Sequence, residues 1–189
     1  MAAAITLSSF GVSAHTVTYV VDTTQTKIVY VGKKVTGEHT GTVTAESGKI
    51  TFVEDIISSG EVVVDMNSLT STDITDKDTN AKYTGHMKSA DFFNTEKFPE
   101  SKIVITSSKK TKNGLEVSGS LTMIGQTRPV TFVVTDLVKT DSTITGKSLL
   151  TLNRTNWGLK YGSNSFFKGL GDKAIKDEFT LAINLSAKK

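Results

Sequence analysis

The chain has 189 residues, enough for one domain of ordinary size with a substantial hydrophobic core. Its 22 lysines and arginines against 19 aspartates and glutamates give a formal net charge of +3, and the basic residues form no stripe, so we expect no nucleic-acid partner. Cysteine is absent, which excludes disulfides, thiol catalysis and thiolate metal sites. These figures indicate a soluble globular domain that folds without covalent crosslinks.

Residues 1–14 are mostly small and apolar, and we expect them to be the remnant of a signal peptide. Val12, Ser13 and Ala14 have the small-residue spacing of a signal-peptidase site, although a positively charged start is missing. The alternative is a frayed apolar arm. We predict one mature domain over residues 15–189, periplasmic or secreted, with no integral membrane segment, because no apolar run approaches about 20 residues.

From residue 50 to residue 185, apolar residues alternate with polar ones in a series of short runs. This period of two, together with many β-branched residues, predicts half-buried β-strands. Turn signals separate the runs, and Asn113-Gly114 is the strongest because this pair favours a tight hairpin. The spacing predicts about eight antiparallel strands, which suits a small closed barrel or a sandwich. The alternating residues include Ile50, Phe52, Val62, Val64, Met66, Ile103, Ile105, Leu115, Val117, Leu121, Met123, Val130, Phe132, Val134, Phe179, Leu181, Ile183 and Leu185.

Two segments interrupt this pattern. Residues 73–88 are polar and lack glycine and proline until Gly85, so we expect a short surface helix or an ordered loop there. Residues 153–177 form a long connection rich in aromatic residues and glycine, and such a connection in a compact domain is usually functional. Its aromatic residues before the last strand are Trp157, Tyr161, Phe166 and Phe167.

Motifs for catalysis, metals and cofactors are weak. No Gly-x-Ser-x-Gly elbow occurs, and His15, His39 and His86 do not have the spacing of a shared metal motif. Residues 169–174 match the loose dinucleotide pattern, but the context favours a glycine-rich bend that leads into a last strand. We therefore predict no catalytic residue, no metal site and no cofactor.

Several stretches follow one another in the order and spacing of a known family. Residues 89–99 read S-A-D-F-F-N-T-E-K-F-P, and residues 119–130 read G-S-L-T-M-I-G-Q-T-R-P-V. Residues 153–158 read N-R-T-N-W-G, and residues 171–175 read G-D-K-A-I. With Tyr19 to Asp22, Val35 to Gly37 and Tyr161 to Ser163, these stretches resemble the YceI-like family from Tyr19 to about Leu185.

The resemblance implies an all-β fold, a single eight-stranded antiparallel lipocalin-like barrel with one short helix and a long aromatic-rich loop. It further implies an exported protein that binds a long-chain isoprenoid or another amphiphilic lipid in the barrel lumen, and that can form a homodimer. Many members carry His-Ser after the first Asp-x-x and a further histidine on the next strand. This chain has Thr24-Gln25-Thr26 and Gly32-Lys33-Lys34 there, so no head-group role is carried over to those positions.

Within such a barrel, we expect inward apolar residues to hold the lipid tail and the mouth to hold the polar head. Arg154, His39 or a lysine would meet an anionic head group, and Trp157, Phe166 and Phe167 would close the entrance. The predicted ligand-binding residues are Phe52, Met66, Phe92, Phe93, Leu121, Met123, Phe132, Trp157, Phe166, Phe167, Arg154 and His39.

Two other functions remain open at the level of sequence. An envelope stress-related interaction protein would have a filled barrel and an exposed apolar patch. A hydrolase or isomerase acting on a small apolar substrate would have polar residues that converge deep in a cavity. A fold alone does not choose among these functions, because one barrel can host many of them.

Overall fold

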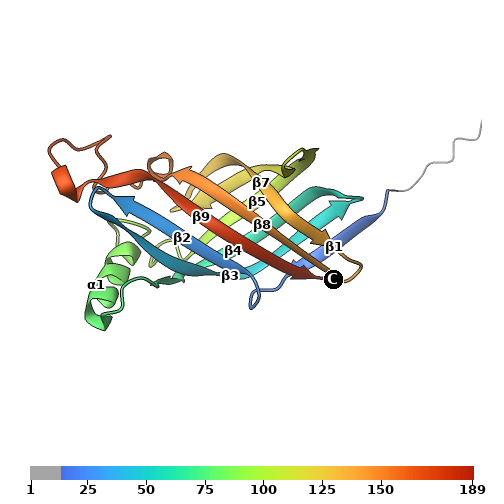
Figure 1. Ribbon diagram of the computed structural model, residues 1–189, viewed down its shortest axis with the longest axis horizontal. Helices are drawn as coiled ribbons and strands as arrows, with labels where there is room; N and C mark the ends of the chain where they lie inside the picture. Colours follow the sequence, from blue (N-terminus) through green and yellow to red (C-terminus); the bar gives the residue numbers. More distant parts are fainter. Residues whose placement is uncertain (1–13) are drawn as a thin grey trace, which may run out of the picture.

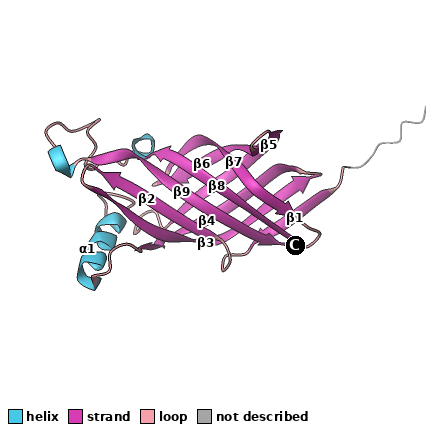
Figure 2. Ribbon diagram, viewed as in Figure 1, coloured by secondary structure: helices cyan, strands magenta, loops and turns pink. Residues whose placement is uncertain are grey.

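The computed structural model describes residues 14–189, and the expected signal-peptide remnant lies outside this range except for Ala14 (Figure 1). Strands dominate the described chain, as predicted (Figure 2). The strands are β1 (Thr16–Val21), β2 (Lys27–Lys34), β3 (Gly37–Val53), β4 (Ile56–Ser71), β5 (Glu100–Thr111), β6 (Gly114–Met123), β7 (Gln126–Lys139), β8 (Thr143–Asn153) and β9 (Ile175–Lys188). The helices are α1 (Lys77–Lys88) and the 3-10 turns η1 (Arg154–Trp157) and η2 (Gly171–Lys173).

All strand pairs are antiparallel, and together they close into a barrel. Neighbouring strands follow the order β3-β2-β9-β8-β7-β6-β5-β4, and β4 pairs back with β3 to complete the circle. The closing pair runs from Gly41 opposite Ser71 to Val53 opposite Ile56. Closure joins the sheet edges that would otherwise be free to pair with another chain.

Strands β1 and β2 are two halves of one interrupted strand. Both run antiparallel to β3, with Val20 opposite Lys49 and Ile28 opposite Val43, and both also pair with β9. The interruption is a turn in which the Asp22 carbonyl oxygen accepts the Thr26 amide at 2.9 Å. Since β1 and β2 share one position in the circle, nine labelled strands give a barrel of eight. The eight-stranded antiparallel barrel predicted from the family resemblance is confirmed.

One end of the barrel is filled by its own side chains. Tyr19 and Phe52 meet edge to face, with ring centroids 6.0 Å apart, and the Tyr19 hydroxyl donates a hydrogen bond to the Thr140 carbonyl oxygen at 2.7 Å. Leu115 and the fully buried Val117 pack in the same cluster. We call this the closed end; it lies at the strand ends opposite α1 in Figure 1.

The opposite end, which we call the open end, carries the two irregular segments. Helix α1 begins after Asp76, whose carboxylate accepts the Thr79 amide at 2.9 Å, so the short surface helix expected within residues 73–88 is confirmed. The long connection from β8 to β9 contains η1 and η2 and projects beyond the strands (Figure 1). No helix within residues 14–189 has both the length and the apolar character needed to cross a bilayer.

Candidate functional site

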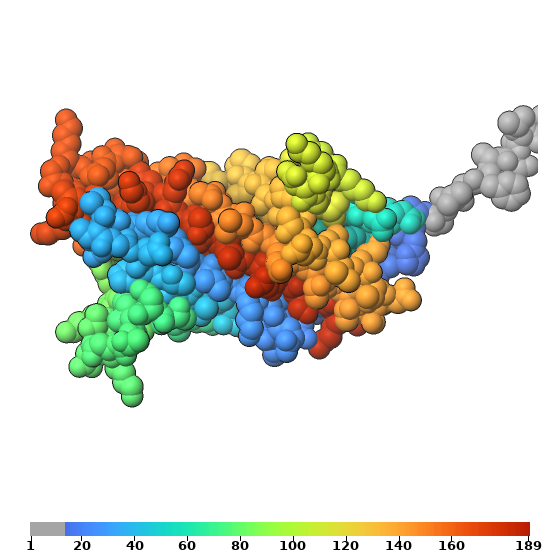
Figure 3. Space-filling model, viewed as in Figure 1, coloured from blue at the N-terminus to red at the C-terminus, as the bar shows by residue number. Residues whose placement is uncertain are grey.

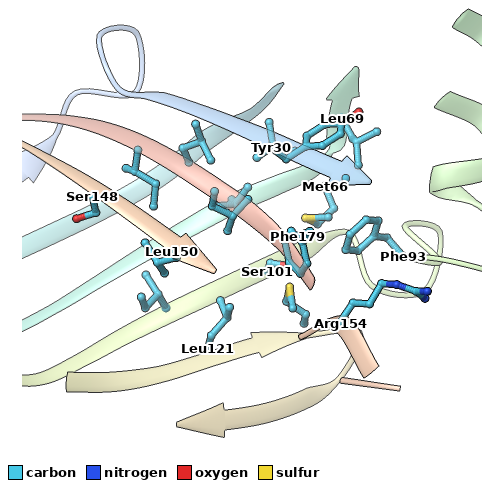
Figure 4. A pocket seen from close by; sticks show the side chains of 18 of the residues that line it. Tyr30, Met66, Leu69, Phe93, Ser101, Leu121, Ser148, Leu150, Arg154 and Phe179 are labelled. Carbon is cyan, nitrogen blue, oxygen red and sulfur yellow. The ribbon is translucent and has the colours of Figure 1, made fainter. Parts of the chain in front are cut away.

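A cavity of about 560 Å³ occupies the barrel between the closed end and the open end. Every strand from β2 to β9 contributes side chains to its wall, and most of them are aliphatic or aromatic (Figure 4). Strand β9 shows how the alternation works, because Phe179, Leu181 and Ile183 face the cavity while the intervening Thr180 and Ala182 do not line it. The filled interior that an interaction protein was expected to have is therefore absent from this barrel.

Most of the predicted ligand-binding residues come together on this wall. Phe52 lies towards the closed end, Leu121, Met123 and Phe132 lie on adjacent strands, and the others are nearer the open end or at its rim. The predicted residues that line the cavity are Phe52, Met66, Phe92, Phe93, Leu121, Met123, Phe132, Arg154 and His39.

The wall also includes residues that the predicted site omitted. Many of them belong to the same alternating runs, so the period of two contained the signal for them. Tyr30 and Leu69 are different, because only the pairing of β2, β3 and β4 brings them to the wall. The omitted residues include Ile28, Tyr30, Val43, Val62, Val64, Leu69, Ile103, Ile105, Leu150, Phe179, Leu181, Ile183 and Leu185.

Arg154 has a different position from the one expected for a head-group ligand. Its guanidinium donates hydrogen bonds to the carbonyl oxygens of Leu159 at 2.7 Å, Lys176 at 3.0 Å and Ile175 at 3.1 Å. It also lies 3.5 Å from the Asp177 carboxylate, and the residue is only 5% exposed. In Figure 4 the guanidinium points away from the other labelled side chains. Arg154 therefore ties the β8–β9 connection to the barrel.

The predicted aromatic lid also differs from the structure. Trp157 does not line the cavity; it is buried beside Leu121, and its indole N–H donates a hydrogen bond to the Leu121 carbonyl oxygen at 2.9 Å. Phe166 and Phe167 also lie off the cavity wall, and each is 49% exposed at the surface. Neighbouring aromatic residues in one connection thus have separate positions, which their spacing in the sequence does not reveal.

Another aromatic cluster stands at the mouth instead. The His86 ring meets Phe92 and Tyr161 edge to face, with centroids 5.1 and 4.9 Å away, and Phe92 and Tyr161 are 5.2 Å apart. These three residues come from α1, the segment after it and the β8–β9 connection, and all of them line the cavity. The mouth is therefore bordered by ring-to-ring contacts between segments that share no strand pairing.

A polar network borders the mouth beside β3. His39 Nδ1 lies 2.8 Å from Asp73 Oδ2, and the His39 ring is 4.6 Å from that of Tyr83. The Tyr30 hydroxyl donates a hydrogen bond to the Thr70 carbonyl oxygen at 2.9 Å, and burial raises the pKa of Tyr30. Burial acts to raise the pKa of Asp73, but hydrogen bonds, chiefly from His39, hold it below its usual value. These pKa shifts widen the pH range over which the Tyr30 phenol is neutral and the Asp73 carboxylate is charged.

Lysines surround the rest of the mouth. Lys34 at the end of β2, Lys173 in η2 and Lys176 in β9 border the cavity, and none of the three has an ion-pair partner in the described part of the chain. Lys33 is 3.4 Å from Glu38 and is mostly exposed. Asp172 is an acidic residue at the same rim.

Within residues 14–189, no three histidine, aspartate or glutamate side chains lie close enough together to hold a metal ion.

These features define a class of protein, a small closed antiparallel barrel with an apolar lumen that opens at one end. The chain belongs to the YceI-like family, because the sequence profile of the YceI-like domain matches residues 19–187. Protein YceI of Escherichia coli O157:H7 is 39% identical over 92 residues, which cover 48% of this chain and 45% of that protein. The chain thus matches about half the length of this curated relative.

Two solved structures share the fold. BcnA of Burkholderia cenocepacia superposes with a TM-score of 0.63 at 21% identity, over 88% of this chain and 99% of that one. A polyisoprenoid binding domain from Saccharophagus degradans, implicated in plant cell wall breakdown, gives a TM-score of 0.61 at 15% identity, over 90% of this chain and 97% of that domain. The barrel is therefore conserved in shape at low sequence identity.

Proposed function

We propose that this chain is an exported, non-enzymatic binding protein for a long-chain isoprenoid or another amphiphilic lipid. The observation that carries the proposal is the apolar lumen of about 560 Å³, within the range of about 300–1,000 Å³ typical of small-molecule sites. The polyisoprenoid binding domain of Saccharophagus degradans supports the choice of ligand class, and membership of the YceI-like family supports export.

The lumen suits a flexible hydrocarbon tail. Transfer of a tail from water to such a wall stabilises the complex by roughly 0.8 kcal/mol per CH₂ group, so ten groups contribute about 8 kcal/mol before the ordering cost. Few polar atoms compete with the tail inside; the hydroxyls of Ser101 and Ser148, both labelled in Figure 4, are among them. The wall can therefore accept tails of different structure without a specific polar contact.

The head group has a separate place at the mouth. Lys34, Lys173 and Lys176 offer ammonium groups, and the His39–Asp73 pair offers a further polar contact. An anionic or strongly polar head is the complement of this rim, because charge-assisted hydrogen bonds to a partly exposed site retain much of their strength. In this arrangement the guanidinium of Arg154 holds the rim together through backbone carbonyl oxygens.

Binding fits the positions of the titratable groups better than catalysis does. The two histidine–carboxylate pairs, His39–Asp73 and His86–Asp91, stand at the mouth, and the wall of the lumen between the mouth and the closed end is mainly apolar. A general acid or base has to lie within hydrogen-bond reach of the reacting atom. A substrate in the lumen would keep most of its atoms away from both pairs.

The proposal is tested with adjacent leucines on opposite faces of β8. Leu150 faces the lumen, whereas Leu149 is 67% exposed on the outside. Native mass spectrometry would measure loading with geranylgeraniol, geranylgeranyl phosphate and palmitate. Leu150→Trp, which fills part of the lumen, should reduce loading at least tenfold, whereas Leu149→Trp should leave loading unchanged. Circular dichroism melting would show that both variants fold.

Extraction of the protein from its native host provides the second arm. Organic solvent should release a long-chain amphiphile in amounts comparable to the protein, and the Leu150→Trp variant should release less. If wild-type protein releases no such molecule and takes up none of the three probes, the proposal is wrong.

A further inference from the structure

The surface beside the mouth exposes aromatic residues in a way that the rest of the described chain does not. Tyr161, Phe166 and Phe167 are the exposed aromatic residues within residues 14–189, and all three lie between η1 and η2. We call residues 158–174 the rim loop. The other large exposed apolar residues are scattered valines and one leucine, Val20, Val35, Val138 and Leu149.

The rim loop holds its phenylalanines at the surface by a fixed backbone turn. The carbonyl oxygen of Ser163, which is completely buried, accepts the amides of Phe166 at 3.1 Å and Phe167 at 2.9 Å. Arg154 anchors the start of the loop through the Leu159 carbonyl oxygen. The two phenyl rings are thus presented to solvent by an ordered support, although neither ring contributes to the cavity wall.

Lysines accompany these rings. Lys160 Nζ lies 4.7 Å from the Phe166 ring centroid, Lys168 follows Phe167 directly, and Lys173 lies in η2. The rim loop contains one acidic residue, Asp172. Exposed aromatic rings among lysines suit the boundary of an anionic bilayer, where the rings enter the head-group region and the ammonium groups meet lipid phosphates.

This surface is continuous with the opening of the barrel. The Val35 amide donates a hydrogen bond to the Ala174 carbonyl oxygen at 3.1 Å, which joins the β2–β3 turn to the end of the rim loop. Val35 itself is exposed, and Lys34 beside it lies on the cavity wall. Figure 3 shows the rim loop as the projection in orange and red at the end of the molecule away from both the C-terminus and the closed end.

We infer that the rim loop docks the open end of the barrel onto an anionic lipid bilayer, with Phe166 and Phe167 inserted at the head-group level. This goes beyond the proposed function, because it concerns the surface that the protein touches and requires no particular ligand in the lumen. Docking in this orientation places the mouth against the bilayer, so a lipid can pass between membrane and lumen without crossing water.

The test is flotation with vesicles of phosphatidylcholine alone and vesicles of phosphatidylcholine and phosphatidylglycerol in equal parts. Wild-type protein should bind the anionic vesicles, and binding should weaken as salt is added. Phe166→Ser with Phe167→Ser should reduce binding at least tenfold. Lys160→Gln with Lys168→Gln should reduce it about 25-fold, because each lysine near an anionic surface contributes a factor of about five.

Matched controls lie elsewhere on the same barrel. Leu149→Ser removes an apolar side chain that is more exposed than Phe166 or Phe167, from the outer face of β8. Lys112→Gln removes a lysine from the β5–β6 turn at the closed end of the barrel. Neither should change vesicle binding.

A direct probe is Phe167→Trp, whose fluorescence should shift to the blue on anionic vesicles and be quenched by brominated lipid. The only native tryptophan, Trp157, is buried and provides a constant background.

Three outcomes would overturn the inference: no binding to anionic vesicles, equal losses in the Leu149→Ser and double phenylalanine variants, or a dimer that the phenylalanine variants dissociate while vesicles stay unbound. The last result would assign the surface to a second copy of this chain. Probe loading measured without vesicles keeps the two proposals separate. The Phe166→Ser, Phe167→Ser double variant should load geranylgeranyl phosphate as wild-type protein does. If wild-type protein binds anionic vesicles but takes up no lipid probe, only the proposed function is contradicted.

Discussion

The two ends of this barrel are built from different interactions. The closed end is a tightly packed apolar cluster around Tyr19 and Phe52, on strands that pair with their neighbours. The open end depends on individual polar and aromatic contacts, such as the Arg154 guanidinium on loop carbonyls and the His86–Tyr161 ring pair. The comparison indicates that both ends stabilise the fold by different interactions, and that the open end in addition controls access to the lumen.

The sharpest test of this division is Arg154→Met. The substitution leaves the carbonyl oxygens of Leu159, Ile175 and Lys176 without their donor and the Asp177 carboxylate without its cation. Loss of one partner from a buried pair typically destabilises a protein by about 3–5 kcal/mol. We expect a loss of that size in urea denaturation, together with weaker ligand loading, because the rim is released.

Arg128 provides the control, since it is the other arginine of the chain and its guanidinium is exposed. Arg128→Met should change the free energy of unfolding by less than about 1 kcal/mol. If the two variants lose equal stability, the anchoring role of Arg154 is incorrect.

Leu115→Ala tests the closed end. Leu115 is buried in the apolar cluster and does not line the cavity. Removal of a buried leucine side chain costs about 2–5 kcal/mol, so the denaturation midpoint should fall markedly. Ligand loading of the folded protein should stay at the wild-type level. A variant that keeps its stability but loses its ligand would reverse the roles that we assign to the two ends.

Gly41→Ala tests the packing between β2, β3 and β4 near the mouth. A Cβ atom at residue 41 would lie 2.3 Å from the Tyr30 hydroxyl oxygen and would also clash with the Thr70 carbonyl oxygen. Tyr30 lies directly opposite Gly41 and uses this space to reach Thr70. We expect a loss of about 1–3 kcal/mol in thermal or chemical unfolding. Gly37→Ala, where nothing lies within 4 Å, is the control.

Asp22→Asn should have the smallest effect, a loss of stability that is present above about pH 4 and vanishes in acid. The Thr24 hydroxyl, with a smaller contribution from Lys188, lowers the pKa of Asp22 from 3.8 to about 2 in the folded state. The unfolded chain binds this proton more readily, so the contribution to stability is present above about pH 4 and disappears as pH falls towards 2. The variant should show a shallower decline of stability across that window. An unchanged slope would contradict the role of Asp22.

The sequence predicted the barrel better than it predicted its mouth. Alternation identified Leu121, Met123 and Phe132 as one face of their strands, because a pleated strand requires a period of two. The family resemblance was needed to choose a closed barrel over a sandwich. Tyr30 and Leu69 were missed because their positions depend on strand register, which no local pattern specifies.

The rim was predicted poorly for a physical reason. Arg154 was expected to face a ligand, but three carbonyl oxygens from segments up to 22 residues away satisfy its donors. Trp157 was expected at the entrance, yet one hydrogen bond to a carbonyl 36 residues earlier fixes it beneath the surface. Aromatic and basic side chains in an irregular connection are placed by such distant backbone partners, which composition does not encode.

The break between β1 and β2 gives the tube a seam. Opposite residues 22–26, β3 residues 44–48 have no register partner on either β1 or β2. Strands β8 and β9, in contrast, are paired over one long uninterrupted run. Separating the strands at this break would disrupt fewer interstrand backbone hydrogen bonds than separating β8 from β9. We therefore expect local opening of the barrel wall here to accommodate ligands of different width. Within β3, amide hydrogen exchange should be fastest at residues 44–48 and should become slower when a ligand is bound.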